Sequence, residues 1–319
     1  MKKFFLLLVI VAQIALLVPG CAEEKDNKLK VGYIPIAECA PLYVAQELHL
    51  FEKHGVQVEF VSMSGGALIL GALRGGTVDV GFSNVVSLVL QRSNGADFQS
   101  IFGATFETSS HRNHALLAVD EHGVAPTELL SSATIAVNTR KNIEELMVRR
   151  YADSIGIPTI GDEQFLEVPF PQMLPLLEAG KVTVASIVEP FITISSNGDG
   201  PEKQLCNHYL STRERSLVAT YVSSENIVSR KGELISRFIA AMAEATEIVN
   251  SREGKAREVV GLYTKIPATL LSQIGMSEFR NEMTEDDLAP VVNDMIKYGF
   301  LADSESVTDL SDIIYKVKE

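Results

Sequence analysis

A short loop, residues 35–41, carries the first side chains able to hold a ligand, Glu38 and Cys39 among them. The strand formers at residues 31–34 precede this loop, and residues 42–54 after it read as a helix. A loop at the carboxyl end of a strand, facing a helix N-terminus, is where open α/β sheets bind ligands. We therefore expect this loop to form one wall of a binding cleft.

Two further loops carry groups that suit an anion. Ser64, Gly65 and Gly66 precede a short apolar helix, so a hydroxyl and exposed N–H groups would meet the positive end of a helix dipole. A plain helix cap explains Ser64 equally well. Arg140 and Lys141 lie at a predicted helix N-terminus, where the dipole disfavours cations. A bound anion would explain them, and so would simple exposure to solvent.

Two glutamates favour the opposite kind of ligand. Glu38 and Glu189 would each attract a protonated amine or a ring N–H, although Glu189 before Pro190 also suits the start of a helix. Ser83 and Asn84 can donate to a ligand or merely cap the helix that follows. The residues therefore leave two ligand classes open, an oxyanion such as a sulfonate and an amine-bearing heterocycle such as an aminopyrimidine.

Predicted strands and helices alternate along the chain and position these loops. Such an order is typical of right-handed crossovers and a mostly parallel sheet. The order that begins at Val31 recurs from Ile135, 104 positions later, and Gly180 lies the same distance after Gly76. Any two stretches of this kind look alike, but the shared offset favours two similar lobes that face each other.

The lobes are expected to divide the chain unevenly. Residues after 222 are mainly helical and lack a sheet of their own, so they must cover an existing one. We therefore predict an α/β fold with a discontinuous lobe 1, residues 29–118 plus 222–319, and a lobe 2 of residues 119–221. Each lobe would be a mostly parallel sheet flanked by helices. Two chain crossings would act as a hinge, with the ligand in the cleft between the lobes.

The first 20 residues read as a targeting segment outside the fold. Lys2 and Lys3 precede an apolar run, and Gly20 precedes Cys21. This order resembles the bacterial lipoprotein signal, in which the cysteine is lipidated, while an ordinary secretory signal or a membrane anchor is the alternative. Residues 21–28 are charged and suit a flexible tether. We expect an exported lipoprotein, anchored to the membrane and facing the periplasm or cell exterior.

The net charge, the cysteine spacing and the absence of certain motifs exclude several kinds of partner and catalytic site. The net charge of -13 argues against nucleic acid and against an acidic membrane surface. We expect Cys39 and Cys206 to stay unpaired, and their spacing from the histidines does not suit a metal site, so no metal or cofactor is predicted. His111, Arg112 and His114 read as solvated loop residues. A phosphate-binding Gly-Lys-Ser/Thr motif and a nucleophile elbow are both missing from the sequence.

With these pieces in place, the chain resembles the periplasmic solute-binding proteins of ABC importers. Within them it is similar to the SsuA-like branch for aliphatic sulfonates, nitrate, taurine and thiamine-pyrimidine precursors. The ordered set of short motifs covers most of residues 28–250. The matching pieces are residues 31–35, 40–45, 50–56, 64–66, 75–81, 179–182 and 189–191.

The resemblance implies that the loops after the strands hold the ligand. Mapped onto this chain, they supply Ile36, Glu38 and Cys39; Ser64, Gly65 and Gly66; Ser83 and Asn84; Asn138, Thr139, Arg140 and Asn142; and Glu189 and Phe191.

The resemblance also implies a monomeric, non-catalytic receptor that delivers a small solute to an ABC permease and ATPase. An extracellular sensing module is one alternative. The other is a pyrimidine-synthesising enzyme of the same fold, which carries a cluster of cysteines that this chain lacks.

Overall fold

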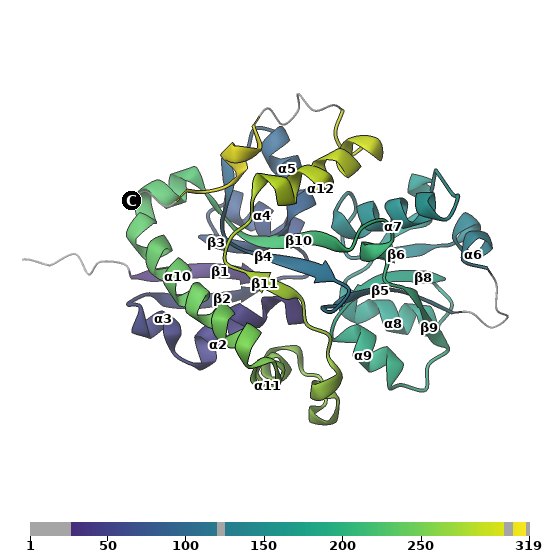
Figure 1. The fold of residues 1–319 in the computed structure, drawn as a ribbon, viewed down its shortest axis with the longest axis horizontal. Coiled ribbons are helices and arrows are strands. Elements are labelled where there is room, and N and C mark those ends of the chain that lie inside the picture. The colour runs from purple at the N-terminus through teal and green to yellow at the C-terminus, as the bar shows by residue number, and fades with distance from the viewer. Residues whose placement is uncertain (1–26, 120–124, 303–308, 317–319) are drawn as a thin grey trace, which may run out of the picture.

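The computed structural model describes residues 27–119, 125–302 and 309–316 (Figure 1). The predicted signal peptide, most of the tether and Cys21 lie outside the described residues. Two sheets, each flanked by helices, lie side by side in Figure 1 and define two lobes. None of the helices in the described ranges combines the length and apolar character that crossing a membrane requires.

Lobe 1 is built on a six-stranded sheet with the order β11-β4-β10-β3-β1-β2. Its strands are β1 (Lys28–Tyr33), β2 (Gln57–Ser62), β3 (Val80–Asn84), β4 (Phe98–Thr108), β10 (Arg215–Ser224) and β11 (Glu278–Arg280). Its helices are η1 (Ala37–Cys39), α2 (Ala40–Glu47), α3 (Leu50–Lys53), α4 (Gly66–Arg74), α5 (Val85–Ser93), α10 (Glu225–Ser251), α11 (Glu253–Thr264), η4 (Ala268–Gln273), α12 (Glu285–Lys297) and η6 (Leu310–Ile313).

Lobe 2 is built on a five-stranded sheet with the order β7-β6-β8-β5-β9. Its strands are β5 (His114–Val119), β6 (Ile135–Val137), β7 (Phe165–Glu167), β8 (Val184–Val188) and β9 (Glu202–Cys206). Its helices are α6 (Pro126–Ser132), α7 (Ile143–Ser154), η2 (Asp162–Gln164), α8 (Phe170–Glu178) and α9 (Phe191–Ser196), and η3 (His208–Leu210) lies in the segment that leads back to lobe 1.

The two sheets share a parallel part that the repeat predicted. Strands β2, β1 and β3 pair in parallel in lobe 1, and β7, β6 and β8 do so in lobe 2. The remaining pairs are antiparallel, so each sheet is mixed rather than mostly parallel. The antiparallel strands include β4, β5 and β10, which lie next to the chain crossings and run toward or away from the other lobe.

The sheets divide the chain earlier than the predicted boundaries at residues 118 and 221. Strand β5 pairs with β8 and β9 and therefore lies in lobe 2, whereas β10 pairs with β3 and β4 and lies in lobe 1. The chain thus crosses between the lobes at residues 109–113 and 207–214. Alternating polarity marks a strand, but it does not tell which of two sheets the strand joins.

The helix expected over residues 42–54 is divided in two. Helix α2 ends at Glu47, and His49 adopts a left-handed backbone with φ of 55° before α3 begins. Strand β3 runs through Ser83 and Asn84. Asn84 then accepts a hydrogen bond from the N–H of Ser87 and caps α5.

Helix α12 packs on α5 in lobe 1 and also contacts α7 in lobe 2. Asp294 of α12 pairs with the buried Arg150 of α7 at 3.2 Å. Near the end of α12, Lys297 pairs with Asp153 of α7 at 2.6 Å. The C-terminal helices therefore return to lobe 1, as the sequence predicted, and α12 also forms ion pairs with α7 of lobe 2.

Candidate functional site

The loops predicted to bind a ligand meet between the two lobes. A Cβ placed on Gly65 of lobe 1 would lie 2.8 Å from Oγ1 of Thr139 in lobe 2 and 3.6 Å from Nδ2 of Asn138. The N–H of Ala37, in the loop after β1, donates to the carbonyl of Glu189 in lobe 2 at 3.1 Å. These contacts place four of the predicted loops along one inter-lobe surface.

Gly66 lies against the loop after β3. A Cβ at this position would lie 2.6 Å from Oγ of Ser83, 3.1 Å from its Cα and 3.2 Å from the N of Asn84. The backbones of α4 and β3 thus approach too closely for any side chain here. Ser64 beside it is exposed.

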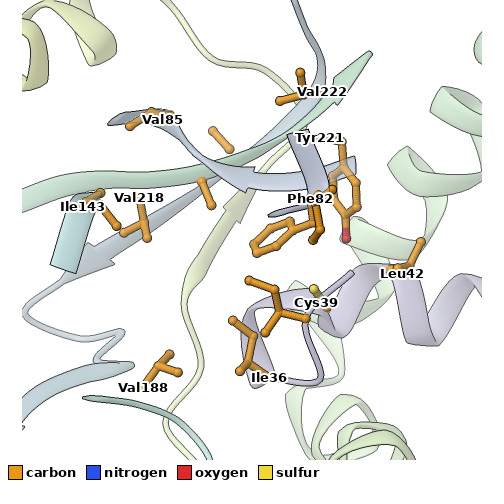
Figure 2. Close-up of a cluster of buried hydrophobic side chains, with 14 of the residues drawn as sticks. Ile36, Cys39, Leu42, Phe82, Val85, Ile143, Val188, Val218, Tyr221 and Val222 are labelled. Atoms are coloured by element: carbon orange, nitrogen blue, oxygen red, sulfur yellow. The ribbon is translucent and has the colours of Figure 1, made fainter. Parts of the chain in front are cut away.

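An apolar cluster fills part of the space between the lobes. It includes Ile36 and Phe82 from lobe 1 and Ile143 and Val188 from lobe 2, all buried (Figure 2). Cys39 belongs to the same cluster, and burial raises the pKa of its thiol far above the ordinary range. Cys39 and Cys206 are both free thiols. Cys39 therefore packs as a small apolar residue.

A buried acid cluster lies beside these loops. It consists of Glu38 from η1, Glu107 from β4, His114 from β5 and Glu144 from α7, each no more than 4% exposed. Glu107 Oε2 lies 3.0 Å from His114 Nδ1 and binds it. The other ring nitrogen, Nε2, is 3.8 Å from Glu38 Oε1 and 3.6 Å from Glu144 Oε1. Three carboxylates from both lobes thus surround one imidazole.

The cluster shifts the pKa of its members strongly. Burial raises the pKa of Glu38 to about 7; His114 opposes this rise, and Glu144 and Glu107 add to it. Burial alone would lower the pKa of His114, but Glu38, followed by Glu107 and Glu144, raises it to about 9. Around neutral pH, His114 is therefore cationic while Glu38 is close to half protonated.

Glu144 is held by polar groups of lobe 2 and the hinge. Tyr209 donates to its Oε1 at 3.0 Å, and Ser186 donates to its Oε2. Because Ser186 gives its proton to Glu144, its Oγ accepts from His208 Nε2, 2.7 Å away. Burial lowers the pKa of His208, which is consistent with a neutral ring. Tyr209 also stacks on His114, with ring centroids 4.0 Å apart.

Oε1 of Glu38 is buried and has no hydrogen-bond partner among the described residues. Glu38, Thr105 and Tyr221 contribute to the lining of a small cavity of about 10 Å³, and the Tyr221 hydroxyl also lacks a partner there. A buried carboxylate oxygen without a donor is costly, so this atom is the clearest unfilled position of the site.

The second predicted glutamate, Glu189, is fully bonded inside the protein. Its Oε2 accepts from the N–H of Thr193 at 3.0 Å, and its Oε1 accepts from Thr193 Oγ1 at 2.9 Å and from the N–H of Gly275 at 3.0 Å. Burial raises its pKa, and these N–H donors oppose the rise. Phe191, in the next turn, packs on Phe170 with a centroid distance of 6.5 Å.

Arg140 is directed to acidic neighbours of its own lobe. Its Nε donates to Oε2 of the buried Glu145 at 2.9 Å, and its Nη1 donates to the carbonyl of Phe165 at 3.2 Å. Asp162 lies 3.6 Å from its Nη2. These partners explain a cation at this helix N-terminus without a bound anion.

Asn142 and Asn138 serve the start of α7. Asn142 Oδ1 accepts from the N–H of Glu145 at 3.4 Å and caps the helix, while its Nδ2 donates to Asn138 Oδ1 at 2.5 Å. The pair fixes the loop that carries Thr139 toward Gly65. The capping role also fixes Glu144 in the first turn, directed to the acid cluster.

The interpretation of His114 as a solvated loop residue is wrong, because the residue is 2% exposed at the centre of the cluster. Glu107, Glu144, His208 and Tyr209 were not singled out at all. Only the position of Glu144, two residues after the capping Asn142, could have been read from the sequence. The described residues contain no group of His, Cys, Asp and Glu placed to hold a metal ion.

Comparison with solved structures shows the fold. The alkanesulfonate-binding protein SsuA from Xanthomonas axonopodis pv. citri superimposes with a TM-score of 0.74 at 14% identity, over 91% of this chain and 98% of that one. The periplasmic nitrate-binding protein NrtA from Synechocystis PCC 6803 gives 0.70 at 13% identity, over 88% and 84%.

Sequence comparison adds a relative and a family. The nitrate import ATP-binding protein NrtC of Synechocystis sp. (strain ATCC 27184 / PCC 6803 / Kazusa) is 28% identical over 195 residues, 57% of this chain. The chain spans only 29% of that relative's length. The NMT1-like family matches residues 22–264, which is most of the chain. The protein therefore belongs to the NMT1-like family and has the two-lobed fold of periplasmic binding proteins.

Proposed function

We propose that this protein is the extracytoplasmic solute-binding component of an ABC importer. It captures a small organic solute between its lobes and performs no chemistry on it. The observation that carries this proposal is the meeting of Gly65 with Thr139 and of Ala37 with Glu189 across the lobes. Loops that touch only when the lobes are together suit a receptor that closes around its ligand.

Delivery to a permease and its ATPase is part of the proposal. The solved neighbours are binding proteins, and the relative NrtC is an import ATP-binding protein, which supports this setting. Lipidation of Cys21 would hold a monomeric receptor at the membrane. A Cys21→Ser variant should then move from the membrane fraction to the soluble fraction. Mass spectrometry of the wild-type N-terminus should show the lipid.

The solute is proposed to be either a sulfonate- or nitrate-like anion or an aminopyrimidine of the thiamine-precursor type. Native mass spectrometry of the purified protein identifies what it carries. Small-angle scattering with and without that solute then measures lobe closure, and calorimetry measures the affinity. A smaller radius of gyration with micromolar or tighter binding supports the receptor. Chemical conversion of the solute by the isolated protein would contradict it.

A further inference from the structure

We infer that Glu38 and Glu144 select a solute bearing a protonated nitrogen or N–H donors and reject oxyanions. This inference rests on the proposed function and assigns the charge of its ligand. Glu38 lies in the loop after β1 in lobe 1, and Glu144 lies in the first turn of α7 in lobe 2. Lobe closure brings the two carboxylates to the same imidazole.

His114 does not satisfy the unpaired oxygen of Glu38. His114 Nε2 is 3.8 Å from Glu38 Oε1 and 3.6 Å from Glu144 Oε1, both longer than an ordinary N–H···O hydrogen bond. Tyr209 already donates to that oxygen of Glu144, but Oε1 of Glu38 accepts nothing. A donor group from a solute would satisfy the unpaired oxygen of Glu38.

The charges around this point favour a cation. The cluster holds three carboxylates against His114, and its other titratable neighbours, His208 and Tyr209, are held neutral by burial. Among the described residues, Arg150 is the only buried arginine or lysine, and it bonds Asp294 instead. Arg140 is bound to Glu145. An oxyanion brought to Glu38 would thus meet like charge, because the nearby cations are already paired: His114 with Glu107, and Arg280, which lines the same cavity, with Glu278.

A cation bound beside Glu38 would stabilise its ionised form. Because the pKa of Glu38 lies near 7 in the solute-free protein, binding at pH 7 would release part of a proton. The affinity for a cation that does not itself titrate should therefore rise between pH 6 and pH 8. His114 stays protonated over this range, so it does not reverse the trend.

Four probes test the inference: ethylammonium, 4-aminopyrimidine, ethanesulfonate and nitrate. Ethylammonium and ethanesulfonate form a matched pair with the same alkyl group. Thermal shift at millimolar probe comes first, followed by calorimetry of the binders at pH 6, 7 and 8 in buffers of different ionisation enthalpy. We expect stabilisation by at least one amine probe and by neither anion, with proton release on binding of ethylammonium.

The variant Glu38→Gln separates recognition from structure. Since Oε1 of Glu38 has no partner, the variant should fold, yet it should bind the amine probe at least tenfold more weakly and release no proton. Glu258→Gln, at an exposed glutamate of α11, is the matched control and should behave as wild type.

Three results would overturn the inference: failure of both amine probes, tighter binding of an anion, or unchanged amine affinity in Glu38→Gln. None of these results touches the proposed function, which depends on closure around the native solute.

Discussion

Asp294 of α12 and Arg150 of α7 form a buried ion pair between the two lobes, with Oδ2 and Nη1 3.2 Å apart. Arg150 also donates to the carbonyl of Tyr209 and, at 3.1 Å, to Oγ of Ser216, both beside the second chain crossing. Arg213 in that crossing shares the same carboxylate at 2.7 Å. One carboxylate therefore pairs with two arginines at the hinge.

Replacing Asp294 with alanine should destabilise the protein strongly. The guanidinium of Arg150 would remain buried without its counter-charge, which typically costs about 3–5 kcal/mol. Urea denaturation followed by circular dichroism gives the free energy of unfolding. Glu258→Gln, which breaks an exposed pair with Lys255, is the control and should change it by less than about 0.5 kcal/mol. Equal losses in the two variants would mean that the Arg150 pair contributes nothing special.

Gly65→Ala should weaken solute binding roughly tenfold, since a methyl group at this position meets Thr139 only when the lobes are together, and overpacking costs about 1–3 kcal/mol. Thr139→Ala in the same chain removes the contacting oxygen and should restore the affinity. Gly71→Ala, within the α4 helix that Gly65 precedes and with open space around it, should leave binding unchanged. A Gly65→Ala protein that binds normally would argue against contact of these loops in the bound state.

Stability of the solute-free protein should depend on pH through Glu38 and His114. The raised pKa of Glu38 means that the folded state holds a proton that the unfolded state loses first, so stability falls as pH rises from 4.5 through about 7. His114 contributes stability that is complete below 6.5 and is lost as pH rises through about 9. Each shift corresponds to about 3 kcal/mol.

Glu38→Gln should flatten this profile between pH 4.5 and pH 9, because it removes one titrating group and the main support for the protonated form of His114. Urea midpoints at pH 5, 7 and 9 measure the effect. If the wild-type and Glu38→Gln profiles run parallel, the two groups are not coupled in the folded state.

Arg140→Gln should leave solute affinity within twofold of wild type. Its guanidinium is engaged by Glu145 and by the carbonyl of Phe165, so it is not available to a ligand. Stability should fall by about 1 kcal/mol, since Glu145 loses a buried partner but keeps Arg149. Calorimetry with the native solute measures this affinity. A tenfold loss of affinity would mean that Arg140 contacts the ligand and would favour an anionic ligand.

Much of the fold could be predicted because local signals are strong where strands and helices alternate. The repeat starting at Val31 and Ile135 corresponds to β1 and β6, which are the central strands of the two parallel parts. Strand β5 was placed in the wrong lobe because its partners, β8 and β9, lie far along the chain. Sheet membership depends on such pairing and not on the strand's own residues.

The site was harder to predict than the fold. Glu38 could be proposed because it follows a strand within one short loop, whereas His114 and Glu107 reach the same point from opposite ends of a chain crossing. The roles of Glu189 and Arg140 could not be predicted from residue type. Glu189 accepts a hydrogen bond from the N–H of Gly275, and Arg140 donates one to Glu145, and these pairings become visible only in the folded structure.

The position of β10 in the sheet of lobe 1 has a consequence for synthesis. Strands β3 and β4 do not pair with each other; β10 lies between them and pairs with both. Every strand of lobe 2 leaves the ribosome before β10 does. The later half of the sequence thus completes the sheet of lobe 1. Until then, β3 has one open edge and β4 has no paired neighbour, because its other partner β11 follows β10. Those open edges make the interval before β10 emerges the time of greatest exposure to aggregation.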